Sequence, residues 1–176
     1  EIAPRTVQWS ANDYPVSDDE LRLAAWYFSE GHLLYNKTKK HGRRYTGFAI
    51  TNHTDRGISD LLNRMGLKWG KSNNQWLIYD KALAIEFARC GNGCLSKTIP
   101  QWMFELSQRQ SRVFLDVYAE GDGYAKGNKR IIYTSSERMA SDIHALAVLA
   151  GFNSSLTKRA ISGQRKWIID HWATST

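Results

Sequence analysis

The chain has 176 residues, of which 42% are hydrophobic and 12% are aromatic, so it is long enough to bury the core of one domain. No stretch of it approaches the ~20 apolar residues that a membrane-spanning helix needs. The first four residues, Glu1 to Pro4, have neither the basic start nor the apolar core of a signal peptide. We therefore expect an intracellular protein that is not secreted and does not contact a membrane.

The charge of the chain is basic, with 24 lysines and arginines against 17 acidic residues, a net charge of +7 and an isoelectric point near 9.5. This surplus is typical of proteins that bind a polyanion, most often nucleic acid, and also of a solvated surface with a positive bias. Charge alone favours neither interpretation.

The two cysteines, Cys90 and Cys94, have no histidine or second cysteine pair nearby, so we expect free thiols in a reducing compartment rather than a zinc site.

The first predicted helix follows an extended N-terminal segment, residues 1–16. Ser17 and Glu20 form a capping box, which predicts a helix over residues 18–29. We expect Gly31 to end this helix, because glycine permits a left-handed turn.

The remaining chain alternates between helices and hairpins. A helix is expected to begin at Thr54 and to end before Gly66, a third is capped by Ser111, and another runs from Ser136 to Gly151. Short runs rich in β-branched and aromatic residues predict strands between them. The other predicted elements are strands over 33–39, 43–51, 68–71, 75–79, 124–126, 129–134, 154–161 and 165–169 and a helix over 81–89.

A nonapeptide occurs twice, as Leu23–Gly31 and Leu115–Gly123, and each copy is mostly apolar and ends in a small residue, an acid and a glycine. The two copies are 92 residues apart (123 − 31 = 92). The same order of helix, hairpin, helix and hairpin surrounds each copy. We therefore expect an α+β fold in which two halves, residues 17–96 and 97–176, form one compact pseudo-twofold domain with the nonapeptide helices at the axis.

Ala25 and Ser29 are four residues apart in the first nonapeptide, as are Val117 and Gly121 in the second, and positions i and i+4 share one helix face. Small side chains on facing helices let two backbones approach closely. A crossing along this face brings Glu30 and Asp122 side by side at one end.

Two neighbouring carboxylates repel each other and become stable with a divalent cation between them. Oxygen ligands favour Mg²⁺, which keeps several waters and shares its site with phosphate oxygens. The chemistry that fits is metal-assisted hydrolysis of a phosphodiester. The alternative is that Glu30 and Asp122 are two acids without a role, but carboxylates are unfavourable at the C-terminus of a helix.

The two nonapeptides, the repeat around them and the segment Lys97-Thr98-Ile99-Pro100 resemble the LAGLIDADG homing endonucleases, in particular the dodecapeptide (DOD) type found within inteins or as free-standing enzymes. The resemblance covers roughly residues 17–172. It implies two αββαββα halves whose strands form a saddle over the major groove of DNA. It also implies that a monomer cuts both strands of a long, asymmetric double-stranded DNA site across the minor groove.

The resemblance also implies the residues of the site. The metal, Mg²⁺ or Mn²⁺, is expected at Glu30 and Asp122, with help from the main-chain carbonyls of Ser29 and Gly121. A basic residue near each acid is expected from the strands, and the candidates are Lys71 and Lys158.

Two positions depart from the family pattern. The first acid is glutamate rather than aspartate, which keeps the charge and lengthens the side chain. Asp116 stands where a small apolar residue is usual, so we expect it to weaken helix packing or to contact a base.

The predicted hairpins carry most of the basic residues, which fits contacts with DNA phosphates and base edges. For any single lysine a solvated hairpin tip is the better interpretation, but for the set it is the poorer one. Two other functions stay open: a non-catalytic nucleic-acid binder on the same fold, such as a maturase-like RNA splicing cofactor or a transcription regulator, and an unrelated helix-rich domain with chance repeats. The candidate DNA-binding residues are Tyr35, Lys37, Lys39, Lys40, Arg43, Arg44, Lys68, Lys71, Gln75, Lys126, Lys129, Arg130, Lys158, Arg159, Arg165 and Lys166.

Overall fold

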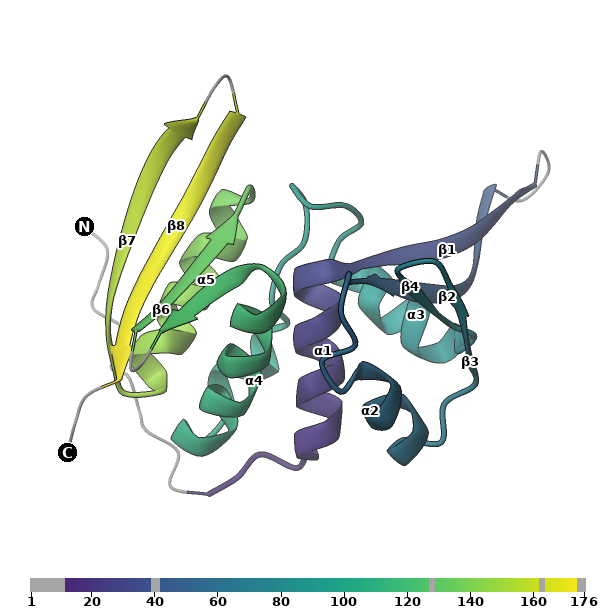
Figure 1. The fold of residues 1–176 in the computed structure, drawn as a ribbon, viewed down its shortest axis with the longest axis horizontal. Coiled ribbons are helices and arrows are strands. Elements are labelled where there is room, and N and C mark those ends of the chain that lie inside the picture. Colours follow the sequence, from purple (N-terminus) through teal and green to yellow (C-terminus); the bar gives the residue numbers. More distant parts are fainter. Residues whose placement is uncertain (1–11, 39–41, 127–128, 162–163, 174–176) are drawn as a thin grey trace.

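The computed structural model describes residues 12–38, 42–126, 129–161 and 164–173. Both halves have the expected order of elements (Figure 1). The first half consists of α1 (Asp18–Glu30), β1 (Gly31–Thr38), β2 (Gly42–Thr51), α2 (Ile58–Arg64), β3 (Trp69–Ser72), β4 (Gln75–Ile78) and α3 (Lys81–Arg89). After a 3₁₀ helix, η1 (Gln101–Glu105), the second half consists of α4 (Gln108–Gly121), β5 (Gly123–Lys126), β6 (Lys129–Thr134), α5 (Glu137–Leu149), β7 (Phe152–Ile161) and β8 (Gln164–Ala173).

The two sheets have the same topology, which confirms the duplication. Their strand orders are β1-β2-β4-β3 and β5-β6-β8-β7, and all the pairs are antiparallel. Lys71 pairs with Trp76 in the first sheet, and Lys158 pairs with Trp167 in the second. Within the described ranges, the second half has no helix that corresponds to α3.

Helices α1 and α4 pack against each other in the centre, and the two sheets lie on either side of this pair (Figure 1). Phe28 of α1 meets the edge of Phe114 of α4, with ring centroids 6.3 Å apart. On the other side of α1, the Tyr27 ring stacks on Phe87 of α3 at 3.9 Å. Because a sheet layer covers one face of α1 and a helix covers the other, its apolar residues are buried almost all round.

Both central helices begin directly after a serine whose side chain caps the helix. Ser17 and Glu20 form the predicted capping box of α1. In α4, however, Ser107 and not Ser111 is the cap, because Gln110 lies three residues after it and completes a second capping box. Ser111 is instead buried inside the helix.

Helix α2 begins at Ile58, four residues later than predicted. The carboxylate of Asp55 accepts hydrogen bonds from the backbone N–H of Ser59 at 3.2 Å and from its hydroxyl at 2.5 Å. Gly57 then takes a left-handed conformation with φ of 80°. The prediction was wrong because these contacts hold residues 52–57 as a loop, and that loop lies at the functional site described below.

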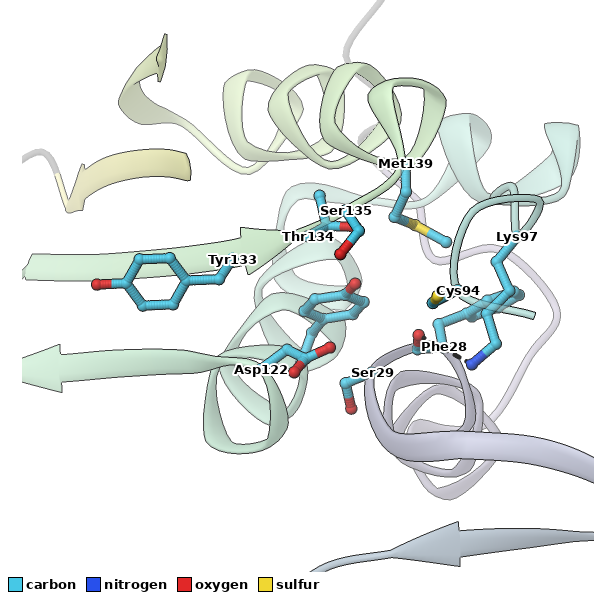
Figure 2. A pocket seen from close by; sticks show the side chains of 10 residues that line it. Phe28, Ser29, Cys94, Lys97, Asp122, Tyr133, Thr134, Ser135 and Met139 are labelled. Carbon is cyan, nitrogen blue, oxygen red and sulfur yellow. Dashed lines mark hydrogen bonds between the residues drawn. The ribbon is translucent and has the colours of Figure 1, made fainter. Parts of the chain in front are cut away.

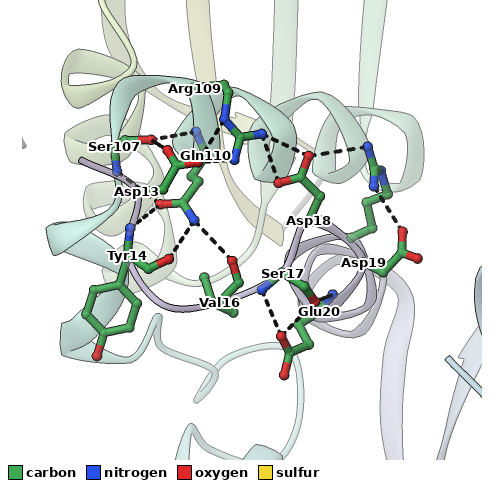
Figure 3. A network of polar contacts seen from close by, with 11 residues as sticks. Asp13, Tyr14, Val16, Ser17, Asp18, Asp19, Glu20, Ser107, Arg109 and Gln110 are labelled. Carbon is green, nitrogen blue, oxygen red and sulfur yellow. Dashed lines mark hydrogen bonds and ion pairs between the residues drawn. The ribbon is translucent and has the colours of Figure 1, made fainter. Parts of the chain in front are cut away.

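The segment before α1 is bound mainly by the second half (Figure 3). Gln110 accepts a hydrogen bond from the N–H of Tyr14 at 2.7 Å and donates to the carbonyls of Tyr14 and Val16 at 2.9 and 3.1 Å. The guanidinium of Arg109 pairs with both Asp13 and Asp18. These contacts join the N-terminal ends of α1 and α4.

In the described ranges, no helix has the length and apolar character needed to cross a bilayer.

The acids at this end predict a loss of stability in acid. A hydrogen bond from Arg109 lowers the pKa of Asp13, one from Arg64 lowers the pKa of Asp19, and one from Ser17 lowers the pKa of Glu20. Because these pKa values are lower in the folded state, the stabilisation is present above the ordinary carboxyl pKa and is lost as the pH falls. We expect the thermal unfolding midpoint to fall between roughly pH 5 and pH 3.

The control for this prediction is Arg109→Leu, which removes the partner of Asp13. Its unfolding midpoint should depend less on pH over the same range. Circular dichroism melts at a series of pH values measure both proteins, and parallel curves would contradict the assignment.

Candidate functional site

Each nonapeptide helix ends in a glycine that lets the first strand start without a loop. Gly31 has φ of −90° and ψ of 155°, so the predicted left-handed turn is wrong. Glycine is required for space: a Cβ on Gly31 would lie 2.5 Å from the carbonyl oxygen of Tyr27, and one on Gly123 would lie 2.6 Å from that of Ala119. The acid before each glycine is therefore fixed where helix and strand meet.

The ends of α1 and α4 touch at Gly121. A Cβ on Gly121 would lie 2.8 Å from the Cβ of Ser29 and 3.0 Å from the Cγ of Glu30, and it would come closer still to the Ser29 hydroxyl. That hydroxyl donates to the carbonyl of Ala25 at 2.9 Å and so folds back along its own helix. Small residues thus permit the close approach that their spacing predicted.

The carboxylates of Glu30 and Asp122 act electrostatically on the same neighbours. Burial lowers the pKa of Lys97, and the charges of both acids oppose this shift. Burial raises the pKa of Tyr118, and the charges of both acids add to this shift. Glu30 is partly buried, and this burial raises its pKa, while the charges of Lys97, His53 and Arg56 oppose the shift. The structure therefore places the two acids in one electrostatic environment.

Lys97 is one of the residues of this site that sequence reasoning missed. Its side chain is 5% exposed, and its Nζ donates to the carbonyls of Tyr27 at 2.7 Å, Gly31 at 2.6 Å and Phe28 at 3.3 Å. Burial lowers the pKa of Lys97 to about 8, although nearby acidic groups oppose the shift. A cation at the C-terminus of α1 also stabilises the helix dipole. In the sequence Lys97 was recognised only as the first residue of a linker.

A cavity of about 100 Å³ lies beside Asp122 (Figure 2). The ends of α1 and α4, the start of α5 and the segment around Lys97 surround it, and Ser29 and Thr134 contribute hydroxyl groups. A polar space of this volume holds several water molecules.

A loop of the first half adds positive charge on the other side. Arg56 lies in the 52–57 loop, and its Nη1 donates to the carbonyl of Glu120 at 2.6 Å. Burial raises the pKa of both Glu30 and Glu120, and the charge of Arg56 opposes this shift. The second half has a much shorter connection here, because β6 ends at Thr134 and α5 begins at Glu137. The surroundings of the two acids are therefore not symmetric.

Two carboxylates with further oxygen groups around them fit a hydrated divalent cation. Within the described residues there is no group of three or more His, Cys, Asp or Glu side chains that could hold a metal. Such a cation would need water or substrate oxygens to complete its shell, which is usual for Mg²⁺. Lys97 and Arg56 bind other carbonyls of the helix ends, not those of Ser29 and Gly121, which were predicted to assist the metal.

The two predicted basic residues lie on the outer strands. The Nζ of Lys71 on β3 lies 4.2 Å from the centroid of the Trp76 ring, and Lys158 is exposed on β7. Among the described residues, the positive charges that shift the pKa of Glu30 belong to Lys97, His53 and Arg56, and Lys71 is not among them. The assistance expected from Lys71 and Lys158 stays a prediction.

Asp116 does not lie in the helix contact. Its side chain is half exposed and forms an ion pair with Arg130 of β6 at 3.3 Å. The expectation that it weakens the packing of α1 and α4 is therefore wrong. Its charge instead compensates one of the candidate DNA-binding residues.

The candidate DNA-binding residues fall into four groups. Those exposed on strands or next to them are Tyr35, Arg44, Lys68, Lys71 and Lys158, and those partly buried are Gln75, Lys129 and Arg130. Lys39 and Lys40 lie outside the described residues. The strand positions of the others are described but their side chains are not: Lys37, Arg43, Lys126, Arg159, Arg165 and Lys166.

Comparison with known sequences finds only partial relatives. No protein-family model matches the chain. It is 32% identical over 105 residues to an ATP-dependent Clp protease proteolytic subunit from Chlamydomonas moewusii, a match that covers 58% of this chain and 10% of that protein. It is 25% identical over 144 residues to a DNA polymerase from Thermococcus sp. (strain GE8), covering 79% of this chain and 8% of the polymerase. The chain thus spans about a tenth of the length of these relatives.

Comparison with solved structures identifies the fold. Variants of the homing endonuclease I-DmoI superpose with a TM-score of 0.63 at 12% identity, covering 89% of both chains. Other structures of I-DmoI were solved with DNA and Mn, Mg or Ca. The N-terminal LAGLIDADG domain of DUF199/WhiA superposes with a TM-score of 0.50 at 12% identity, covering 89% of this chain and 78% of that one. The chain therefore has a LAGLIDADG-type fold.

The close contact at Gly121 predicts that one added methyl group lowers the stability of the protein. Gly121→Ala places a Cβ against Ser29 and Glu30, and overpacking of this kind costs about 1–3 kcal/mol of unfolding free energy. Urea unfolding measures the loss. Glu120→Ala, on the exposed side of the same helix turn, is the control and should change stability much less.

The hydrogen bonds from Lys97 to three carbonyls predict that its substitution also lowers the free energy of unfolding. Lys97→Met keeps the length of the side chain and leaves three carbonyls without this donor, which costs about 1–3 kcal/mol. Lys81→Met on the exposed side of α3 is the matched control. Equal urea midpoints for the two variants would show that the buried ammonium does not stabilise the end of α1.

Proposed function

We propose that the chain is a site-specific, double-strand DNA endonuclease that hydrolyses phosphodiesters with divalent metal ions at Glu30 and Asp122. The observation that carries this proposal is the contact of the two nonapeptide helices at Gly121 and Ser29, which brings two carboxylates to one Lys97. A pair of acids at the meeting point of two duplicated halves matches a reaction on two antiparallel DNA strands.

The residues of the site have separate parts in this reaction. Glu30 and Asp122, with the carbonyls of Ser29 and Gly121, would hold Mg²⁺ or Mn²⁺. When bound, the metal polarises the phosphoryl oxygen, lowers the pKa of the attacking water and stabilises the leaving oxygen. Lys97 fixes the end of α1 and offsets the charge of the acids, and the cavity beside Asp122 has room for the water that attacks.

Double-stranded DNA is the partner that the charge distribution favours. The net charge is +7, and the exposed residues Arg44, Lys68 and Lys158 lie on or beside hairpins of both sheets. The I-DmoI structures with target DNA support this assignment through a shared fold. Since one chain supplies two halves of different sequence, we infer a monomer acting on a long, asymmetric site.

We also infer that the chain is encoded as a mobile segment, as in an intein or an intron. Two of the curated relatives have names that describe unrelated activities, a protease subunit and a DNA polymerase, yet each matches this chain over about a tenth of its own length or less. We infer that the matching segment is an insertion in both proteins and that it does not carry either named activity.

The alternative is a nucleic-acid binder on the same fold without catalytic activity, such as a splicing cofactor or a transcription regulator. The likeness to WhiA supports it, because it extends the fold beyond the homing endonucleases. The acids in both motifs favour the endonuclease, since a binder has no need of two carboxylates beside a phosphate backbone.

Substitution of the two acids tests the proposal. Glu30→Gln and Asp122→Asn keep the shape of each side chain and remove the charge that holds the metal, so each should slow cleavage at least ~100-fold. The substrate is a plasmid with a duplex selected from a randomised library by the wild-type protein, and EDTA should block its linearisation. Glu86→Gln removes an exposed acid from α3 and is the control.

Two results would contradict the assignment. Cleavage at the wild-type rate by both acid variants would exclude Glu30 and Asp122 as metal ligands. Tight duplex or transcript binding by the wild-type protein without any cleavage, with either metal, would favour the non-catalytic alternative.

A further inference from the structure

The loop between α3 and Lys97, residues 91–96, is a feature that the two sheets and the acid pair do not explain. It lies at the end of α1 where β1 begins, between the two sheets (Figure 1). Its residue Leu95 is 72% exposed, the largest exposure among the large apolar side chains of the described residues. A single exposed leucine is ordinary, so the exposure alone decides nothing.

The loop is held in one conformation by its own backbone. The N–H of Thr98 donates to the carbonyl of Cys90 at 2.8 Å and closes the loop at its base. Inside it, the N–H groups of Ser96 and Lys97 both donate to the carbonyl of Gly93, at 3.1 and 3.2 Å. Gly91 and Gly93 have φ of 98° and 99°, which other residues rarely adopt. The loop is therefore preorganised and presents Leu95 without having to order it on binding.

The loop also borders the cavity beside Asp122. Cys94 lines the cavity beside Asp122 together with Ser29 and Lys97 (Figure 2). Lys97 follows the loop directly and fixes it to the end of α1 through three carbonyls. The 91–96 loop therefore lies at the helix ends that carry the acids, beside the cavity at Asp122.

We propose that the 91–96 loop is a third DNA-contacting element, which enters the minor groove between the two cleaved bonds and places Leu95 against the central base pairs. This inference rests on the proposed function. Proteins that bind the minor groove use exposed apolar side chains to separate base steps and bend the duplex. Because such contacts favour base steps that deform easily, Leu95 gives the protein a preference at central positions that no hairpin side chain touches.

Leu95→Ala tests the proposal in a binding assay without added metal, so that no cleavage is needed. The probe is the duplex that the wild-type protein selects by binding from a randomised library. We expect about tenfold weaker binding by Leu95→Ala, because the apolar contact is lost. Val148→Ala, at an exposed apolar position on α5, should bind like the wild type. Unfolding curves confirm that both variants are folded.

Repeating the selection with each variant separates the loop from the hairpins. Leu95→Ala should lose preference at the central base pairs only, and Arg44→Ala on β2 should lose it at outer positions only. Equal affinity and an unchanged central preference for Leu95→Ala would overturn the proposal while leaving the endonuclease intact. If the wild-type protein selects no duplex at all, both proposals are overturned.

A second readout uses the thiol of Cys94 in the Cys90→Ser variant, which has no other cysteine. Bound duplex should slow the alkylation of Cys94 by iodoacetamide about tenfold, since the loop is covered. Alkylation at the same rate with and without duplex would place the loop outside the complex and overturn the proposal.

Discussion

The contact between α1 and α4 at Gly121 and Ser29 is the constraint on which the rest of the structure depends. No side chain larger than hydrogen fits at Gly121 without moving the end of α1. Because the acids follow directly in the chain, this contact also sets their separation. Each helix passes straight into the first strand of its sheet, so the crossing of two helices sets the relation between the two sheets as well. The same helix contact therefore determines both the packing of the core and the geometry of the site.

The two halves have the same strand topology but differ in the residues that surround their acids. Both sheets have the same strand order, yet the environment of the acids differs between the halves. His53 and Arg56 come from a loop that only the first half has at this length, and Lys97 comes from the single connection between the halves. The repulsion between the two acids is therefore reduced by His53, Arg56 and Lys97, and among the described residues these positive groups have no counterpart in the other half. In the proposed endonuclease, such a site would distinguish the two strands of the duplex.

Sequence patterns predicted most of the fold because its signals are local. The Ser17 capping box and the glycine stops identified helices, and the offset of the nonapeptides identified the duplication. The errors have physical causes: Gly31 is required for space rather than for φ, and Ser107 rather than Ser111 has Gln110 three residues later. Lys97 was missed because its role depends on carbonyls about 70 residues earlier in the chain, which no local pattern records.

The strap formed by residues 13–16 has a consequence for exchanging halves between relatives. It precedes the first half in the chain, but its hydrogen bonds go to Gln110 and its ion pair to Arg109 of the second half. A chimera joined within the 97–100 connection would pair the strap of one parent with the α4 of another. Successful hybrids should therefore inherit the strap and α4 from the same parent, with the first crossover placed at Ser17 rather than ahead of it.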